Sequence, residues 1–226
     1  MDGGVRLPEI FFCPGVPSGE AAAGVISRAA AAGAEVFEVT PPILARLSFG
    51  ERSEGVVAVG SPARRRLEDL PLSARPLVAV LEGIEKPGNV GAIVRSADAA
   101  GLDAIVVANP RTDLYNPNAI RASLGTLFSV PVCEATTGAT LDWLRSRGLA
   151  IFAARVDGSV PYTQADFRRP AAIVLGSEAE GLSTAWTGKE IEAVRLPMRG
   201  AADSLNVSAA AAVLFFEAVR HREEVG

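Results

Sequence analysis

Short apolar segments recur through the last two-thirds of the chain, and they restrict the fold more than any other feature of the sequence. Most are bounded by Gly, Pro or polar residues, and they alternate with stretches of helical character. Short strands that are apolar along their whole length are typical of a parallel sheet buried on both faces. The expected strands are Leu77–Leu81, Ala104–Ala108, Val130–Cys133, Ala150–Ala154, Ala172–Leu175 and Ala193–Leu196. From Pro76 onward the sequence therefore predicts an α/β fold around a parallel sheet.

Helices are expected between these strands and after the last one. The predicted helices are Asn89–Ala100, Pro117–Leu127, Thr140–Arg147, Thr184–Thr187 and Asn206–Arg222. The N-terminal part reads as a small, separate α/β unit with strands at 9–13, 35–39 and 55–60 and helices at 21–32 and 41–47. Prolines and arginines between 61 and 75 favour a linker. The expected organisation is a domain at 1–60, a linker at 61–75 and a second domain at 76–226.

Composition excludes several classes of site. The hydrophobic share of 49% in 226 residues suffices for a real core, and no apolar run reaches the roughly 18 residues of a membrane span. Cys13 and Cys133 match no metal spacing, and His221 is the only histidine, so neither a metal site nor a histidine-based triad is expected. The first residues lack the apolar segment of a signal peptide. We expect a cytoplasmic protein with no membrane or metal partner.

The overall charge of the chain does not by itself indicate a nucleic-acid partner. The net charge is −4 and the pI is about 5.2, whereas phosphate binding usually leaves a basic footprint. All basic residues except Lys86 and Lys189 are arginines, however, and the guanidinium fork suits phosphate. A local group of arginines can therefore matter more than the total charge.

The first chemical motif is Asn89-Val-Gly-Ala-Ile-Val-Arg95, which follows an apolar strand and opens a helix. Asn89 is predicted to be the N-cap, and Gly91 allows another backbone to approach closely. Arg95 comes almost two turns later and can lie on the same side of the helix. An arginine in this apolar stretch needs an anion, which is either a bound phosphate or a structural acid such as Asp98.

Two further motifs follow later strands. Gly176-Ser-Glu-Ala-Glu-Gly181 permits a tight loop that carries Glu178. Leu196-Pro-Met leads through small residues to Ser204-Leu-Asn-Val-Ser208, where Asn206 or Ser208 can cap the last helix. In open α/β proteins, ligands bind at the edge where parallel strands end.

Together and in order, the three motifs resemble the signature of the SpoU (TrmH-like) branch of the SPOUT RNA methyltransferases. The resemblance extends roughly from Leu77 to Glu217. It implies a parallel sheet with a C-terminal trefoil knot, which periodicity alone cannot indicate. Residues 7–60 resemble only the later half of the RNA-gripping N-terminal α/β domain common in this family, so a partial domain is expected.

The resemblance also implies the site. It assigns catalytic roles to Asn89, Arg95, Glu178, Ser204 and Asn206, and it implies binding of S-adenosylmethionine by Gly176, Leu196 and Leu205. Arginine side chains stay protonated in proteins, so Arg95 is expected to hold phosphate and stabilise a developing alkoxide. The final proton acceptor stays open.

The implied function is S-adenosylmethionine-dependent 2′-O-methylation of RNA ribose. Large-subunit ribosomal RNA is preferred because of the N-terminal unit and the string from Tyr115 to Gly125, in which Arg121 either meets RNA or ends a helix. A role in antibiotic resistance is left open. The alternatives are a transfer-RNA 2′-O-methyltransferase and a non-catalytic RNA-binding or assembly factor of the same fold.

Two further expectations concern other nucleotides and the assembly. The chain lacks a Gly-x-Gly-x-x-Gly fingerprint and a P-loop, which argues against a Rossmann-like nucleotide enzyme. The family resemblance implies a homodimer. The region of Phe215 and Phe216 in the last helix is expected close to its interface.

Overall fold

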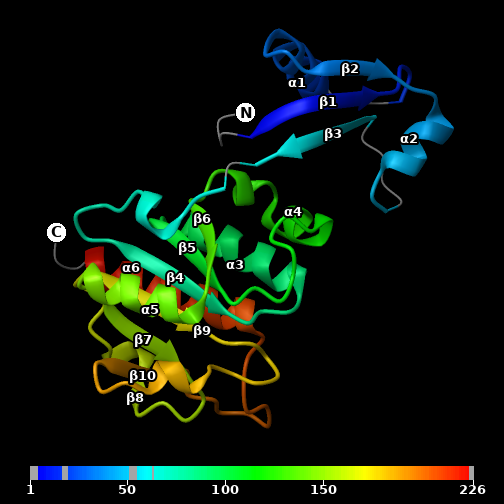
Figure 1. Ribbon diagram of the computed structural model, residues 1–226. Coiled ribbons are helices and arrows are strands. Elements are labelled where there is room, and N and C mark those ends of the chain that lie inside the picture. Colours follow the sequence, from blue (N-terminus) through cyan, green and yellow to red (C-terminus); the bar gives the residue numbers. More distant parts are fainter. Residues whose placement is uncertain (1–4, 17–19, 51–54, 63, 224–226) are drawn as a thin grey trace. The chain divides into compact units, whose positions relative to one another are not determined.

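The computed structural model describes residues 5–16, 20–50, 55–62 and 64–223. The chain divides into two compact units, Met1–Ala63 and Arg64–Gly226. Figure 1 labels their helices and strands. Each unit has its own sheet, so we describe them separately.

The first unit is a three-stranded sheet with the order β2-β1-β3. β2 runs parallel to β1 and β3 antiparallel to it. Ile10, Ala29 and Leu44 are buried and form its small core. Its elements are β1 (Arg6–Phe12), α1 (Glu20–Ala31), β2 (Glu35–Glu38), α2 (Pro41–Leu47) and β3 (Val56–Ser61). These elements match the expected ones to within a few residues.

The second unit contains a seven-stranded sheet with the order β6-β5-β4-β9-β7-β10-β8. Every strand pair in the described part of this sheet is parallel, as predicted. The strands are β4 (Leu77–Glu82), β5 (Ala104–Ala108), β6 (Val132–Ala135), β7 (Ala150–Ala154), β8 (Val160–Pro161), β9 (Ala171–Leu175) and β10 (Ile191–Arg195). Sequence analysis missed β8, because two residues are too few to leave a pattern.

Helices cover both faces of this sheet, and the central strand β4 shows how. Leu77, Ala79 and Leu81 belong to the core formed with α3 (Pro87–Ala99), α4 (Pro117–Ser123) and α6 (Val207–Glu223). Val78 and Val80 belong to the opposite core, formed with α5 (Thr137–Ser146). Successive side chains of a strand point to opposite faces, so a strand between two helical layers must be apolar throughout.

Several boundaries differ from the sequence predictions. α3 begins at Pro87, which is pre-organised for a first helical turn, so Asn89 is not the N-cap. α4 ends at Ser123 rather than at 127, because Leu124 and Gly125 adopt left-handed backbone angles, with φ of 51° and 88°. Thr136 caps α5 through its Oγ1, which accepts a hydrogen bond from Ala139 N at 3.2 Å.

The described short helices complete the second unit. They are η1 (Leu67–Asp69), η2 (Thr126–Phe128), η3 (Tyr162–Gln164) and η4 (Thr184–Thr187). The stretch 64–75, expected to be part of a linker, belongs to this unit, and Leu70 is buried in the core beside α5. Within the described residues, no helix is both long and apolar enough to cross a membrane.

Candidate active site

The site forms where β4 and β9, two neighbours in the middle of the sheet, come to an end. Leu81 of β4 lies opposite Leu175 of β9, so the loops that follow leave the sheet at the same edge. The first loop leads into α3 and carries the first motif, and the second carries Glu178. The start of α6 packs against α3. The topology therefore brings three motifs that are far apart in sequence to one place (Figure 1).

Glu178 is the centre of the hydrogen-bonded cluster at this place. Its Oε1 accepts hydrogen bonds from Asn89 Nδ2 at 3.2 Å and from Asn206 Nδ2 at 2.5 Å. Lys86 Nζ forms an ion pair with its Oε2. Asn206 Nδ2 also donates to Asn89 Oδ1, at 3.2 Å. The structure thus joins one predicted residue from each of the three motifs.

The surroundings of Glu178 favour its ionised form. The ion pair with Lys86 lowers the pKa of the Glu178 carboxyl most, and the hydrogen bond from Asn89 lowers it further. Its side chain is 28% exposed, so solvent still reaches it. A charged acceptor at this point fixes the donors around it, as expected for charge-assisted hydrogen bonds.

Asn206 acts in two directions at the start of α6. Its Oδ1 accepts hydrogen bonds from Ser208 N at 3.0 Å and from the Ser208 hydroxyl at 2.6 Å. This is the predicted helix cap, and it leaves the amide nitrogen to point at Glu178. Asn89 does not cap α3 as predicted, because Pro87 starts this helix. Its side chain instead belongs to the Glu178 cluster. Both amides are therefore committed to holding the loops together.

Arg95 lies on α3 with its side chain exposed. Within the described part of the chain, no hydrogen bond or ion pair reaches its guanidinium, and Asp98 does not pair with it. The six residues from Asn89 turn the helix by about 600°, which leaves Arg95 roughly 120° away around its axis. Asn89 and Arg95 therefore do not share one side of α3. Arg95 stays outside the Glu178 cluster and presents a free cation to solvent.

The other predicted residues lie on the loops around this cluster. Ser204 is exposed, and its hydroxyl donates to Asp203 Oδ1 at 3.3 Å rather than to the cluster. Gly176 packs so tightly that a Cβ there would lie 2.3 Å from the carbonyl carbon of Gly181. Leu196 packs against the core, whereas Leu205 is exposed.

These loop residues fit a nucleoside-like cofactor in their chemistry. An exposed Leu205 offers the apolar contact that adenine requires, and the backbone of Gly176 lies against that of Gly181 in the neighbouring loop. A pocket of about 90 Å³ opens nearby, and its lining residues are Ile84, Glu85, Lys86, Asn89, Ser177, Glu178, Ala179 and Val207. It is smaller than a typical small-molecule site of about 300–1,000 Å³. Leu196 and Leu205 are not among these residues.

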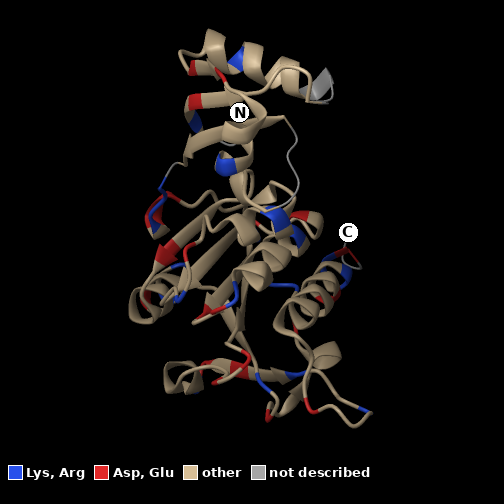
Figure 2. Ribbon diagram, turned by 90° about the vertical axis from the view of Figure 1, so that its right-hand side faces the viewer, with Lys and Arg blue, Asp and Glu red and all other residues tan. Residues whose placement is uncertain are grey.

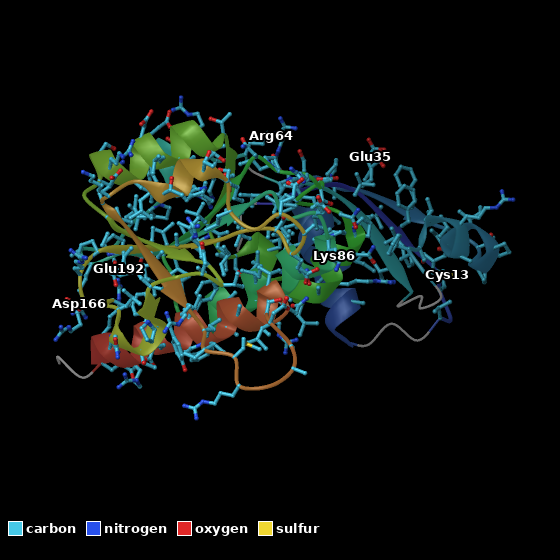
Figure 3. All side chains as sticks on the ribbon, turned by 90° about the horizontal axis from the view of Figure 1, so that it is seen from below. Cys13, Glu35, Arg64, Lys86, Asp166 and Glu192 are labelled. Carbon is cyan, nitrogen blue, oxygen red and sulfur yellow. The ribbon has the colours of Figure 1, made fainter. Side chains whose placement is uncertain are left out.

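Lys86 is the site residue that sequence analysis missed. It immediately precedes α3 and is labelled in Figure 3. Its ammonium forms an ion pair with Glu178. A signal was available, since Lys86 is one of two lysines in an arginine-rich chain and precedes Pro-Gly-Asn directly. Nothing in the sequence, however, indicates which acid it meets.

Basic and acidic residues alternate along the part of the chain that the structure describes (Figure 2). In Figure 2, Lys and Arg positions are interspersed with Asp and Glu positions along the ribbon. Several arginines are engaged by nearby acids, among them Arg66 with Glu68 and Asp69. This pattern agrees with the overall charge of −4.

Comparison with known proteins gives a consistent result. A model of the SpoU rRNA methylase family matches residues 76–216. A 23S rRNA (uridine(2479)-2′-O)-methyltransferase of Streptomyces viridochromogenes is 36% identical over 197 residues, which cover 83% of this chain and 68% of that protein. The 23S rRNA (guanosine-2′-O-)-methyltransferase RlmB of Ralstonia nicotianae is 33% identical over 205 residues, covering 88% and 82%.

Solved structures agree with the sequence relatives. The AdoMet-bound rRNA methyltransferase of Sinorhizobium meliloti superposes with a TM-score of 0.88 at 28% identity, covering 97% of this chain and 82% of that one. The resemblance seen in the three motifs is thereby confirmed over most of the second unit. The chain belongs to the SpoU rRNA methylase family.

Proposed function

We propose that this protein transfers a methyl group from S-adenosylmethionine to a ribose 2′-hydroxyl of large-subunit ribosomal RNA. One observation carries the proposal: Asn89, Glu178 and Asn206, from three separate motifs, converge at the carboxyl edge of the sheet. Membership of the SpoU family and relatives named as 23S rRNA 2′-O-methyltransferases support it. They also favour ribosomal RNA over the transfer-RNA and assembly-factor alternatives.

In this reaction some residues position the loops and others contact the RNA. The cluster of Glu178, Asn89 and Asn206 holds the loops in place, and Arg95 binds a phosphate of the RNA and stabilises charge that develops on the 2′-oxygen. Ser204, whose hydroxyl is exposed, contacts the RNA from the loop before α6. The free guanidinium of Arg95 supports this division.

The cofactor site lies between the second and third motifs. Bound S-adenosylmethionine supplies an electrophilic methyl group on a sulfonium. In our proposal Gly176 presents backbone groups to it, while Leu196 and Leu205 face its adenine. The exposed side chain of Leu205 supports this assignment.

The fold in our proposal includes the family's C-terminal knot and a partial N-terminal RNA-binding domain at 1–60. The sheet order supports the knot, because the chain must return from β10, beyond β7, to place α6 against α3. The βαβ arrangement of β1, α1 and β2 supports a compact first domain. We further propose a cytoplasmic homodimer, since an enzyme of ribosomal RNA works where ribosomes are made.

The test is methyl transfer to defined RNAs. Purified protein with isotopically labelled S-adenosylmethionine should label protein-free 23S rRNA, and mapping of blocked 2′-hydroxyls should find one position. Transfer RNA and 16S rRNA are the comparison substrates, and the Arg95→Ala protein is the negative control. Labelling of transfer RNA alone would favour the alternative substrate. A folded protein that binds neither the cofactor nor its demethylated product would overturn the proposal.

A further inference from the structure

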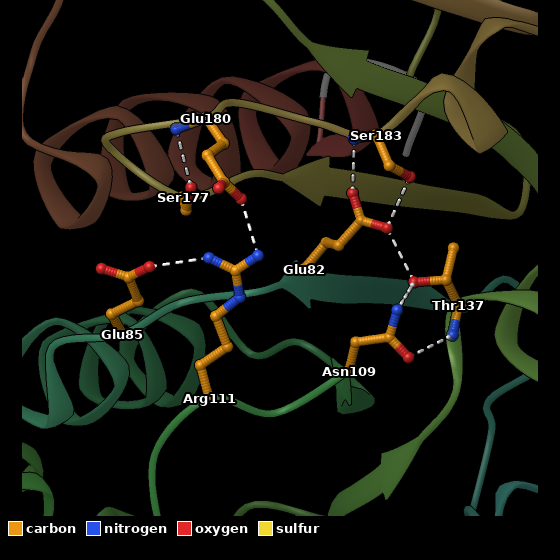
Figure 4. Close-up of polar contacts among 8 residues, drawn as sticks. All are labelled: Glu82, Glu85, Asn109, Arg111, Thr137, Ser177, Glu180 and Ser183. Carbon is orange, nitrogen blue, oxygen red and sulfur yellow. Dashed lines mark hydrogen bonds and ion pairs between the residues drawn. The ribbon is translucent and has the colours of Figure 1, made fainter.

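The loop that carries Glu178 is fixed by side chains that the three motifs do not include. Within the loop, Gly181 N donates to Ser177 O and Glu180 N donates to Ser177 Oγ, each at 3.0 Å. Gly181 has a φ of 69°, a conformation that favours glycine. These contacts shape the loop but do not attach it to the rest of the site. Figure 4 shows the contacts that do.

Glu82, at the end of β4, holds the far end of the loop. It is 6% exposed, its Oε2 accepts from Ser183 N at 2.7 Å, and its Oε1 accepts from Ser183 Oγ at 2.8 Å. Oε1 also accepts from Thr137 Oγ1 at 2.7 Å, and Asn109 Nδ2 donates to Thr137 Oγ1 at 2.9 Å. This buried and satisfied carboxylate gives the loop a fixed base.

Arg111 holds the outer part of the same loop. It lies in the segment that follows β5, whose last residue, Ala108, is level with Glu82 in the sheet. Its Nη1 donates to Glu85 Oε1 at 2.7 Å and its Nη2 donates to Glu180 Oε2 at 2.6 Å. Glu85 precedes α3 and Glu180 lies two residues after Glu178. Arg111 therefore joins the loops of the first and second motifs.

We propose that Arg111 is a positioning residue for methyl transfer, because it clamps Glu180 to Glu85 and so keeps Glu178 against Asn89 and Asn206. The guanidinium fork serves two carboxylates on different loops, which a single ammonium cannot do with the same geometry. The effect on rate rests on the proposed function, whereas the effect on the loop does not. Arg111 acts through the position of Glu178 and has no contact with the reacting atoms in this assignment.

Removing Arg111 should disturb the loop without unfolding the protein. Its side chain is 45% exposed, and ion pairs of exposed groups contribute little to global stability. Arg111→Ala should therefore melt within about 3 °C of wild type. A misplacement of about 1 Å in an active site can cost on the order of a hundredfold in rate, so single-turnover methylation should fall about ten- to a hundredfold. Binding of the RNA should change much less than the rate.

A matched control is available in Arg145. It is 47% exposed and pairs with Asp142 and Glu190, so it also bridges two acids, but it lies on α5 away from the loop. Arg145→Ala should leave the methylation rate unchanged. Glu180→Ala should reproduce the loss seen in Arg111→Ala, and the double variant should be no worse than either single one. Arg111→Lys should restore the rate only in part.

The decisive measurement is amide hydrogen exchange, which needs no activity. The amides of Glu180 and Gly181 should exchange severalfold faster in Arg111→Ala than in wild type or Arg145→Ala. If wild type proves to lack methyl transfer, the proposed function fails while faster exchange still supports the clamp. Unchanged exchange in this loop, or equal single-turnover rates in Arg111→Ala and Arg145→Ala, would overturn the proposal.

Discussion

Arg95 and Glu178 differ in how their charges are used. The Glu178 carboxylate accepts from Lys86, Asn89 and Asn206, so its charge is already neutralised by groups that hold the loops together. Arg95 has no described partner and is exposed. A cation that the protein leaves unpaired beside an ordered polar cluster is available to an anion from outside. In the proposed function, that anion is a phosphate of the RNA.

Replacement of Arg95 separates a chemical role from a structural one. Arg95→Ala should slow single-turnover methylation about a hundred- to a thousandfold, because one well-placed electrostatic contact has an effect of that order. Arg95→Lys should also be strongly impaired, since an ammonium lacks the two-point grip on phosphate. The melting temperature and cofactor binding should stay unchanged, as measured by calorimetry. A stable Arg95→Ala enzyme with near-normal turnover would contradict the proposed mechanism.

The shifted pKa of the Glu82 carboxyl should make the free energy of unfolding depend on pH. Burial tends to raise the pKa of this carboxyl, but the hydrogen bonds from Ser183 and Thr137 outweigh burial, and the pKa is lowered from its ordinary value of 4.5. The ionised form is thus favoured by folding. Its contribution is complete above pH 4.5 and is lost as the pH falls through the lower folded-state pKa.

Urea unfolding of Glu82→Gln tests this dependence. At neutral pH the variant should be less stable by about 1–3 kcal/mol, because its amide leaves the Ser183 donors poorly satisfied. The difference from wild type should shrink as the pH falls below 4.5. Glu134→Gln, at an exposed position on β6, is the control and should stay within about 0.5 kcal/mol of wild type. A pH-independent difference would contradict the assignment.

At the scale of elements, the contact of α3 with α4 depends on a single glycine. A Cβ at Gly91 would lie 2.2 Å from Ala119 O and 2.9 Å from Ala122 Cβ. The two helices can approach this closely only because residue 91 has no side chain. The close approach fixes α3, and α3 in turn carries Asn89 and Arg95.

Gly91→Ala should therefore push the two helices apart. The expected loss is about 1–3 kcal/mol, as for other overpacked sites, despite the better helix propensity of alanine. Gly88→Ala, in the same helix, meets no atom within 4 Å and should be neutral or slightly stabilising. Thermal unfolding of the two variants gives the comparison. Equal stability of both would show that the helices adjust freely at this contact.

The sequence predicts the strands of the second unit well, and its limits have physical causes. Short apolar runs bounded by turn residues, such as Leu77–Leu81, favour buried strands, and β4 confirms this prediction. The start of α3 differs from the predicted one because Asn89 and Pro87 both suit a helix start, and local preference does not rank them. The partners of Lys86 and Arg111 depend on strand order, which no local pattern contains. The three motifs indicated the reaction, whereas their supporting contacts required the fold.

At the scale of the whole molecule, α6 has one buried side that packs in the core and another that exposes apolar residues. Phe215 is fully buried among the core residues around α3, so within the region expected near the interface it belongs to the monomer core. Phe216 is 51% exposed, and Val213 is also exposed on the same helix. Residue 216 is thus the better candidate for contact with a second copy.

Two neighbouring substitutions distinguish these roles. Phe215→Ala should cost about 3–5 kcal/mol of stability, as expected for a buried aromatic residue. Phe216→Glu should leave the monomer folded and shift the protein from dimer to monomer in sedimentation at micromolar concentration. A wild-type protein that sediments only as an active monomer would rule out the proposed dimer.

The pairing of β4 with β9 delays the completion of the sheet during synthesis of the chain. Leu77 pairs with Ala171, so the ribosome must add more than ninety residues before the second neighbour of β4 exists. At about 5–20 residues per second, this edge of an apolar strand waits roughly 5–20 s for its partner. β5 can protect only the other edge during that time. During this interval the unpaired edge of β4 in the nascent chain is available for a chaperone to bind. Codons before Ala171 that slow translation would lengthen this interval.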